Sequence, residues 1–225
     1  MFEERRPLLS RVLPESGAQK WAHYPAKDAR DTRCRSRWYF HAHSNPSHDH
    51  QTQESAAVGH FHLFLHRTQL PQDIEPKVWP PQREHCKAHV AHIAALSVDR
   101  EGKPLSWFSV NRFVTNEFLY PATSMIDHLP DFNVEHTQED GLVNRFLTAM
   151  VALFRDEVTE LLIERDAIQS ELETRFGADA YEKPSGVEVL ARKTINLEAK
   201  LRSVQLLAAT GGARRSETQH CLAGR

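Results

Sequence analysis

The sequence predicts an α+β protein, in which an antiparallel, open or barrel-like β-sheet (about residues 21–120) precedes a C-terminal helical hairpin (about residues 140–209). Two observations predict this fold class. Aromatic and aliphatic runs of strand length, bounded by polar segments, fill the first half of the chain. After residue 140, apolar residues recur at helical spacing instead.

The expected strands follow the apolar runs of the first half. Residues 37–43 and 60–66 form two such runs, and the polar segment 44–55 separates them. A hairpin is expected from residues 89–98 and 105–114, because the six residues between these runs have the composition of a turn. These segments make up the predicted sheet.

Two helical segments are expected in the second half. Apolar residues from Leu142 to Leu172 recur at helical spacing and predict one long amphipathic helix, or two in line. A similar pattern from Val187 to Val204 predicts another helix of about twenty residues. These helices either cover one face of the sheet or form an arm that binds a second copy of the chain or a partner protein.

The domain organisation follows from composition. The 225 residues are 40% hydrophobic and 26% charged, which suits one sizeable domain at residues 21–209. Residues 1–20, rich in arginine, glutamate and proline, are expected to form a flexible arm. Residues 210–225 are expected to form a disordered tail, because they are mostly small and polar.

Charge and apolar content limit the partners and the location of the chain. A net charge of −2 gives no electrostatic reason to expect a nucleic-acid partner. No secretory segment is evident, and no apolar run approaches the roughly 18–20 residues that span a membrane. Three widely separated cysteines do not suggest a disulfide framework. We therefore expect a cytoplasmic protein that acts on a small molecule.

Two His-x-His pairs are the most distinctive feature of the predicted sheet. One pair closes the run Trp-Tyr-Phe-His-Ala-His, and the other lies in the run Gly-His-Phe-His. Residues i and i+2 of a strand point to the same face, so each pair can present two imidazoles side by side. Two such strands could place four imidazole nitrogens around one metal ion, contributed by His41, His43, His60 and His62.

The ligand set favours a transition metal but leaves its identity open. Imidazoles without cysteine argue against a structural zinc finger and allow iron, copper or catalytic zinc. Asp49 and Glu54, in the polar segment, could add an oxygen ligand or orient a ring. The alternative is that the histidines are partly exposed polar residues on a sheet face and bind no ion.

A second group of candidate residues lies near the end of the expected hairpin. Arg112 could bind a carboxylate or phosphate with two parallel hydrogen bonds, and Glu117 could accept a proton. Tyr39 shares a strand face with His41 and His43, which makes it a third catalytic candidate. The alternative is a strand end with solvated charges.

Several segments resemble an uncharacterised, mostly proteobacterial family that is known as a domain of unknown function. Its signature, Tyr-Phe-His-Ala-His followed by Gly-His-Phe-His, occurs here at residues 39–43 and 59–62. Further blocks match at residues 23–25, 92–99, 111–115, 153–155 and 161–166, so the resemblance spans about residues 21–205. The chain departs from the family by inserting residues 44–56. The resemblance implies that His92 belongs with the paired histidines, and a regular strand would direct His89 to the opposite face.

Three functions remain open at this point. The leading hypothesis is a small metal-dependent enzyme of redox or hydrolytic type, in which iron, copper or zinc is held by the five candidate ligands. The second is a metal carrier, sensor or assembly factor that acts with a partner protein. The third is a metal-free enzyme in which histidines act as acids and bases on an anionic substrate held by Arg112.

Overall fold

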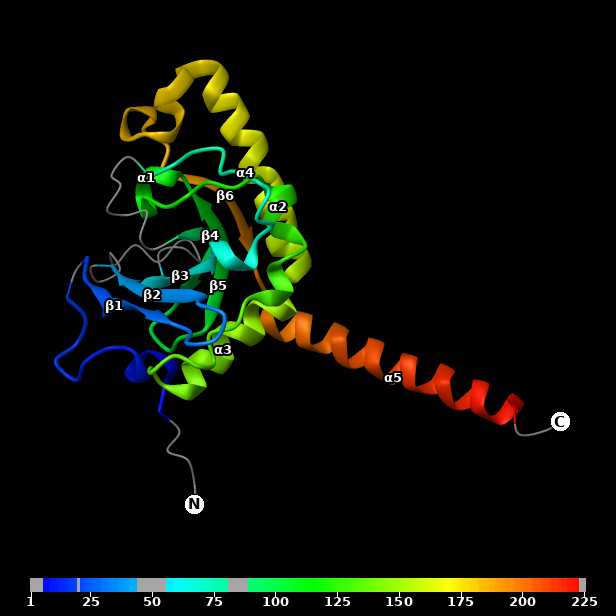
Figure 1. Ribbon diagram of the computed structural model, residues 1–225. Coiled ribbons are helices and arrows are strands. Elements are labelled where there is room, and N and C mark those ends of the chain that lie inside the picture. Colours follow the sequence, from blue (N-terminus) through cyan, green and yellow to red (C-terminus); the bar gives the residue numbers. More distant parts are fainter. Residues whose placement is uncertain (1–5, 20, 44–55, 81–88, 223–225) are drawn as a thin grey trace. The chain divides into compact units, whose positions relative to one another are not determined.

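The computed structural model describes residues 6–19, 21–43, 56–80 and 89–222 (Figure 1). The chain divides into two compact units, residues 1–194 and residues 195–225. The first unit contains a six-stranded antiparallel sheet together with helices, so the predicted α+β class is confirmed.

The sheet has the strand order β1-β2-β3-β4-β5-β6, in which every strand pairs with its neighbour in sequence. β1 and β6 do not pair with each other, so the sheet does not close into a barrel. The strands are β1 (His23–Arg30), β2 (Arg37–Ala42), β3 (Gly59–His66), β4 (Val90–Val98), β5 (Pro104–Val110) and β6 (Val189–Thr194).

One face of the sheet is apolar and supports the helices. Its largest side chains are at most 1% exposed and comprise Trp38, Phe40, Phe61, Leu63, Leu96 and Trp107. The indole nitrogen of Trp38 donates to the side-chain oxygen of Asn144 in α3 (3.0 Å), and α4 contacts β4, β5 and β6. These helices therefore cover the apolar face and leave the other face to the histidines.

The predicted long helical segment is two helices in line, α3 (Gly141–Leu153) and α4 (Arg155–Phe176). They meet at Phe154, whose backbone is not helical. The Asp140 carboxylate begins α3 by accepting the backbone N–H groups of Leu142 (2.8 Å) and Val143 (3.2 Å). Arg11 reaches the same carboxylate at 3.1 Å.

The helix expected from Val187 to Val204 is wrong in its first half. Residues 189–194 form β6, which pairs with β5 through partners such as Phe108 and Arg192, and helix α5 begins only at Leu197. The apolar spacing fits either structure over so short a segment. The open edge of β5 offers backbone hydrogen bonds to an adjacent strand, and this tertiary pairing decides the outcome.

The predicted hairpin forms from β4 and β5, but its second strand stops at Val110. Asn111 is followed by the short helix α1 (Arg112–Thr115), so the expected strand through residue 114 is wrong at its end. The chain then passes through α2 (Ala122–Ile126). Single-turn helices complete this unit at η1 (Leu8–Arg11), η2 (Arg67–Gln69), η4 (Leu129–Asp131), η5 (Gly177–Tyr181) and η6 (Lys183–Ser185).

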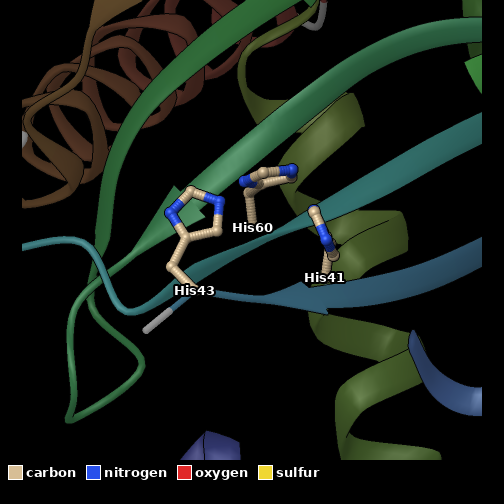
Figure 2. A group of neighbouring side chains, drawn as sticks. All are labelled: His41, His43 and His60. Carbon is tan, nitrogen blue, oxygen red and sulfur yellow. The ribbon is translucent and has the colours of Figure 1, made fainter. Parts of the chain in front are cut away.

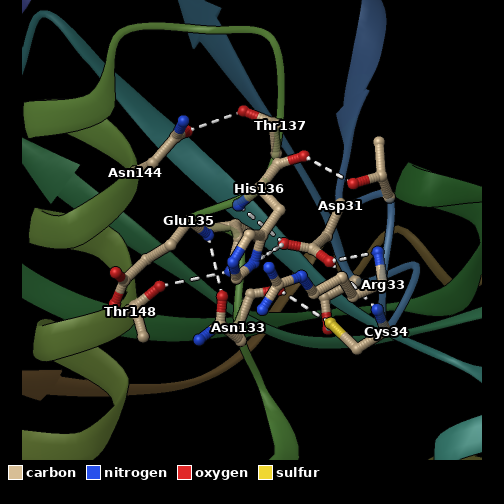
Figure 3. A network of polar contacts seen from close by, with 12 residues as sticks. Asp31, Arg33, Cys34, Asn133, Glu135, His136, Thr137, Asn144 and Thr148 are labelled. Atoms are coloured by element: carbon tan, nitrogen blue, oxygen red, sulfur yellow. Dashed lines mark hydrogen bonds and ion pairs between the residues drawn. The ribbon is translucent and has the colours of Figure 1, made fainter.

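A buried carboxylate joins the β1–β2 connection to the segment before α3 (Figure 3). Asp31 is fully buried and accepts the backbone N–H groups of Arg33 (2.8 Å), Cys34 (2.9 Å) and His136 (2.9 Å). Burial by itself would raise the pKa of Asp31, but these hydrogen bonds together lower it. The charged Asp31 carboxylate therefore has a structural role, because it holds the β1–β2 connection against the segment before α3.

The described residues of both terminal segments include helical structure. Within the expected arm, η1 buries Leu9, at 4% exposure. In the second unit, α5 (Leu197–Leu222) extends into the segment expected to be a tail, and the side chain of Asn196 accepts the N–H of Ala199 (3.0 Å). No helix in the described part of the chain has the length and apolar character required to cross a membrane.

Candidate metal centre

The register of β2 and β3 places the two His-x-His pairs together. His41 lies directly opposite His60, and Tyr39 lies opposite His62. Directly paired residues of antiparallel strands share a face, so these side chains all project from the side of the sheet away from the helices. We call this side the histidine face. His43 follows β2, and its N–H donates to the carbonyl of Val58 (2.9 Å), which continues the strand pairing by one residue.

Three of the histidines converge on one point (Figure 2). The potential ligand nitrogens of His41, His43 and His60 all lie within 4.8 Å of one another. The ring centroids of His43 and His60 are 4.8 Å apart, and those of His41 and His60 are 5.2 Å apart. His60 is 8% exposed, whereas the other two are half-buried. The cluster is therefore anchored in the sheet but accessible from one side.

The cluster suits a transition-metal ion. Nitrogens that share one tetrahedral ion at about 2.0–2.1 Å lie roughly 3.4 Å apart, so a small side-chain rotation would bring the three into range. No carboxylate or thiol joins this group among the described residues, and the donor set is three imidazoles. Imidazole ligands suit zinc, copper and iron.

The electrostatics keep the three imidazoles neutral, which is the form that binds a metal. Burial, with smaller contributions from His23 and His43, lowers the pKa of His41 to about 4. Burial also lowers the pKa of His43, and burial together with the neighbouring histidines holds the pKa of His60 well below its ordinary value. A metal therefore does not have to displace protons from these rings at neutral pH.

Gly59 permits the close contact between β2 and β3 at the cluster. It lies opposite Ala42, and a β-carbon at this position would overlap the Phe40 ring and the carbonyl oxygen of His41. Only glycine leaves room for the strand that carries His60. Close strand packing thus explains why glycine precedes the second histidine pair.

The family comparison agrees with this architecture. The family model described as Domain of unknown function (DUF6969) matches residues 1–195. The chain belongs to this family. The match contains all six strands and the histidine face, and it ends just after β6. No curated protein and no solved structure matches the chain. The resemblance inferred from the sequence motifs is confirmed, and the chemistry has to be argued from the site.

In this DUF6969 member, the buried His62 and the half-buried His92 form a separate pair beside the three clustered histidines. The Nδ1 of His62 and the Nε2 of His92 are 3.0 Å apart, and His62 is 1% exposed. The His62 ring lies 4.5 Å from that of His60, so the pair touches the cluster without joining it. Burial, then the neighbouring histidines, lowers the pKa of His62 strongly. Burial and the charge of Arg165 lower the pKa of His92 to about 3.

A β-bulge places His92 on the histidine face. Leu63 pairs with Ala94, but the next residue, Phe64, pairs with His92 and skips Ile93. A regular β4 would direct His92 to the apolar face together with Ala94, as strand alternation predicts. The extra residue reverses the alternation, so the placement implied by the family resemblance is the one observed.

None of the three catalytic candidates lines the cavity beside the clustered histidines. Tyr39 is buried between His23 and His62, at ring distances of 4.4 and 4.8 Å. Burial, then the charges of Glu117 and Asp28, raises the pKa of its hydroxyl.

Arg112 and Glu117 line a small cavity of about 20 Å³ that also contacts His92. Arg112 is 4% exposed and is engaged by Glu182, Asn116 and the carbonyl of Tyr181. Burial and the charge of Asp28 raise the pKa of Glu117 to about 8, while Arg37 acts in the opposite direction. These residues support the sheet from beside the buried pair, and their catalytic roles stay predictions.

Other histidines fall into distinct settings. His66 is buried and begins η2, because its ring nitrogen accepts the N–H of Thr68 at 3.2 Å. The ring of His89 lies 5.7 Å from Phe118 and outside the cluster. The remaining sequence candidates, Asp49 and Glu54, lie outside the described residues.

Sequence reasoning missed three residues around the site. His23 pairs with His41 across β1 and β2, and their rings are 5.2 Å apart. Trp21 lies against both half-buried histidines of the cluster, with its ring 5.5 Å from His41. Arg192 falls within the helix that the sequence predicts over residues 187–204, so it does not stand out as a site residue. The aromatic and histidine content of residues 21–24 is the available signal for the other two residues.

Proposed function

We propose that this DUF6969 protein is a metal-dependent enzyme with a mononuclear site built from His41, His43 and His60. The observation that carries the proposal is the convergence of three neutral imidazoles beside a cavity of about 370 Å³. Structural zinc sites are closed by four protein ligands, whereas catalytic sites use three and keep a position open for water or substrate. The three-histidine set beside a cavity is typical of the second kind.

A metal ion held by these imidazoles would supply Lewis acidity for hydrolysis or, if it were iron or copper, a redox-active centre for oxidation. The protein's part is to fix the ligands. His41 and His60 are held by paired strands, and His43 by the hydrogen bond to Val58. His62 packs against the ring of His60 and is itself held by His92, so this pair would orient the His60 ring.

The two alternative functions fit the site less well. A carrier has no need of a ligand-sized cavity next to the ion, although the exposed apolar residues of α5 would suit a partner protein. A metal-free acid–base mechanism needs a histidine that titrates near neutral pH. The lowered pKa values of His41 and His43 make both rings weak bases and good ligands.

Metal analysis tests the proposal directly. Protein purified without an affinity tag is expected to contain about one equivalent of zinc, iron or copper, and a spectrum would identify a redox metal. His43→Ala should abolish this stoichiometry, while His128→Ala, which alters a half-buried histidine outside the cluster, should preserve it.

Substoichiometric metal that is unaffected by His43→Ala would refute the site. Activity that survives exhaustive chelation would select the acid–base alternative. Freely exchangeable metal, together with copurification of one partner protein, would select the carrier.

A further inference from the structure

The cavity beside the clustered histidines is shaped by the same face of the sheet. Its polar floor includes Ser97 and Ser106, which are paired across β4 and β5 in the row that begins at His60. Its walls are largely apolar, from Trp21, Leu105, Phe108, Val114 and Val189. A volume of about 370 Å³ suits a small organic molecule and exceeds the needs of water alone.

Arg192 contributes a guanidinium group to this cavity. It lies opposite Phe108 on β6, with its guanidinium carbon 4.6 Å from the ring centroid. One nitrogen donates to the Ser106 hydroxyl at 3.0 Å. The Phe108 ring is in turn 5.0 Å from the ring of His60, so Arg192 and the clustered histidines line one continuous surface.

The described lining of the cavity contains one permanently positive side chain and one acidic side chain. Among the lining residues that the structure describes, Arg192 carries the one side chain that is permanently positive, and Glu188 is an exposed residue of the lining. The next residue along β6, Lys193, points to the opposite face and pairs with Glu160 and Glu164 of α4. Of the neighbouring residues Arg192 and Lys193, strand alternation therefore directs only Arg192 toward the cavity.

We propose that the cavity binds a small monocarboxylate with an apolar body, whose carboxylate pairs with Arg192 while its other end faces His41, His43 and His60. A planar guanidinium matches a carboxylate with two parallel hydrogen bonds, and stacking on Phe108 holds it in orientation. One cation does not neutralise a phosphate dianion. The apolar walls accommodate the rest of the molecule. The inference rests on the proposed function for the role of the histidines, but the binding step does not require a metal.

Binding of benzoate tests this assignment. Benzoate is expected to bind both metal-free and zinc-loaded protein, as measured by titration calorimetry or by ligand-observed NMR. Arg192→Gln should weaken binding about ten- to hundredfold, because a hydrogen-bonded ion pair is lost. Arg192→Lys should recover part of the affinity, since it keeps the charge without the planar geometry. Lys193→Gln is the matched control and should bind benzoate as the wild type does.

The outcomes separate this inference from the proposed metal site. If His60→Ala loses zinc binding but keeps benzoate binding that depends on Arg192, both the metal ligand and the carboxylate site are supported. If no metal binds and benzoate still requires Arg192, the substrate class stands and the metal proposal falls. Absence of benzoate binding, equal affinity in Arg192→Gln, or tighter binding of phenyl phosphate or benzamide would overturn the inference.

Discussion

The two ends of the histidine face are built from the same strands and residue types, yet they differ in access. At the open end, His41, His43 and His60 border a cavity of about 370 Å³. At the closed end, His62 is 1% exposed and pairs with His92 beside a cavity of about 20 Å³. Imidazoles that converge beside open space can bind an exogenous ion, whereas imidazoles that satisfy each other in a packed interior stabilise the sheet.

This difference teaches that sequence spacing does not by itself assign a histidine to a site. His60 and His62 belong to one His-x-His pair on one strand, and they fall on opposite sides of the division. The residues on the neighbouring strands decide which of the two histidines borders the cavity. His60 faces Ser97 on β4, a small residue that leaves room, while His62 lies against His92 and Tyr39.

The largest expected difference between variants at the two ends of the histidine face is in their metal affinity. Outer residues that orient a ligand typically change metal affinity about ten- to hundredfold. His62→Gln should fall within that range, whereas His60→Ala, which removes a ligand, should cause a larger loss. Competition with a zinc-binding dye measures both. Equal losses in the two variants would erase the distinction between the ends.

A side chain added between β2 and β3 at Gly59 should destabilise the open end of the histidine face. Gly59→Ala places a methyl group against the Phe40 ring and the backbone of His41, so we expect overpacking to cost about 1–3 kcal/mol in the free energy of unfolding. Urea unfolding measures this change. Gly141→Ala is the control, because a β-carbon there meets no other atom within 4 Å. A tolerated Gly59→Ala variant would contradict the close packing of these strands.

The closed end should respond to removal of one member of its pair. His62→Leu leaves His92 without its partner, and an unsatisfied buried polar group costs about 1–3 kcal/mol. The double variant His62→Leu/His92→Leu should recover part of this loss, since both polar groups are then absent. A double-mutant cycle measured by thermal unfolding gives the coupling. Strictly additive effects would show that the two rings do not stabilise each other.

The last prediction concerns Glu117 near the closed end, and its effect depends on pH. The folded pKa of about 8 lies above the ordinary value, so the folded state holds a proton that the unfolded state releases. Stability from this group is complete below about pH 4.5 and is lost as the pH rises through about 8. Glu117→Gln should remove this dependence and differ little from wild type at pH 5. Parallel urea unfolding of both proteins from pH 5 to 9 checks it, and identical pH profiles would contradict a raised pKa of the half-buried Glu117 carboxyl.

Local patterns were sufficient where one face of an element had to be buried. Alternation along residues 37–43 and 60–66 predicted β2 and β3 and the side that carries the histidines. Helical spacing likewise predicted α3 and α4. The cluster of His41, His43 and His60 could be anticipated, because matched strands with the same polar face have few other ways to pair.

Other features depended on contacts that spacing does not encode. β6 is a strand because the edge of β5 was open to it, and that edge is supplied by a segment about eighty residues earlier. Arg192 entered the site only through this pairing. Tyr39, Arg112 and Glu117 were reasonable candidates by residue type, yet their positions depend on packing that brings β2, α1 and the segment after α1 around His92.

The sequence by itself determined that the chain is an α+β protein of a recognisable family with paired histidines on adjacent strands. Strand alternation has a period of two, and apolar burial fixes which face each side chain takes. The tertiary structure alone decided that three histidines form the open cluster and that His62 and His92 pair with each other beside it. A bulge opposite Phe64 reverses the alternation of β4, and the small side chains opposite His60 leave the cavity that His62 lacks. Such pairing arises between distant segments, and no local pattern specifies it.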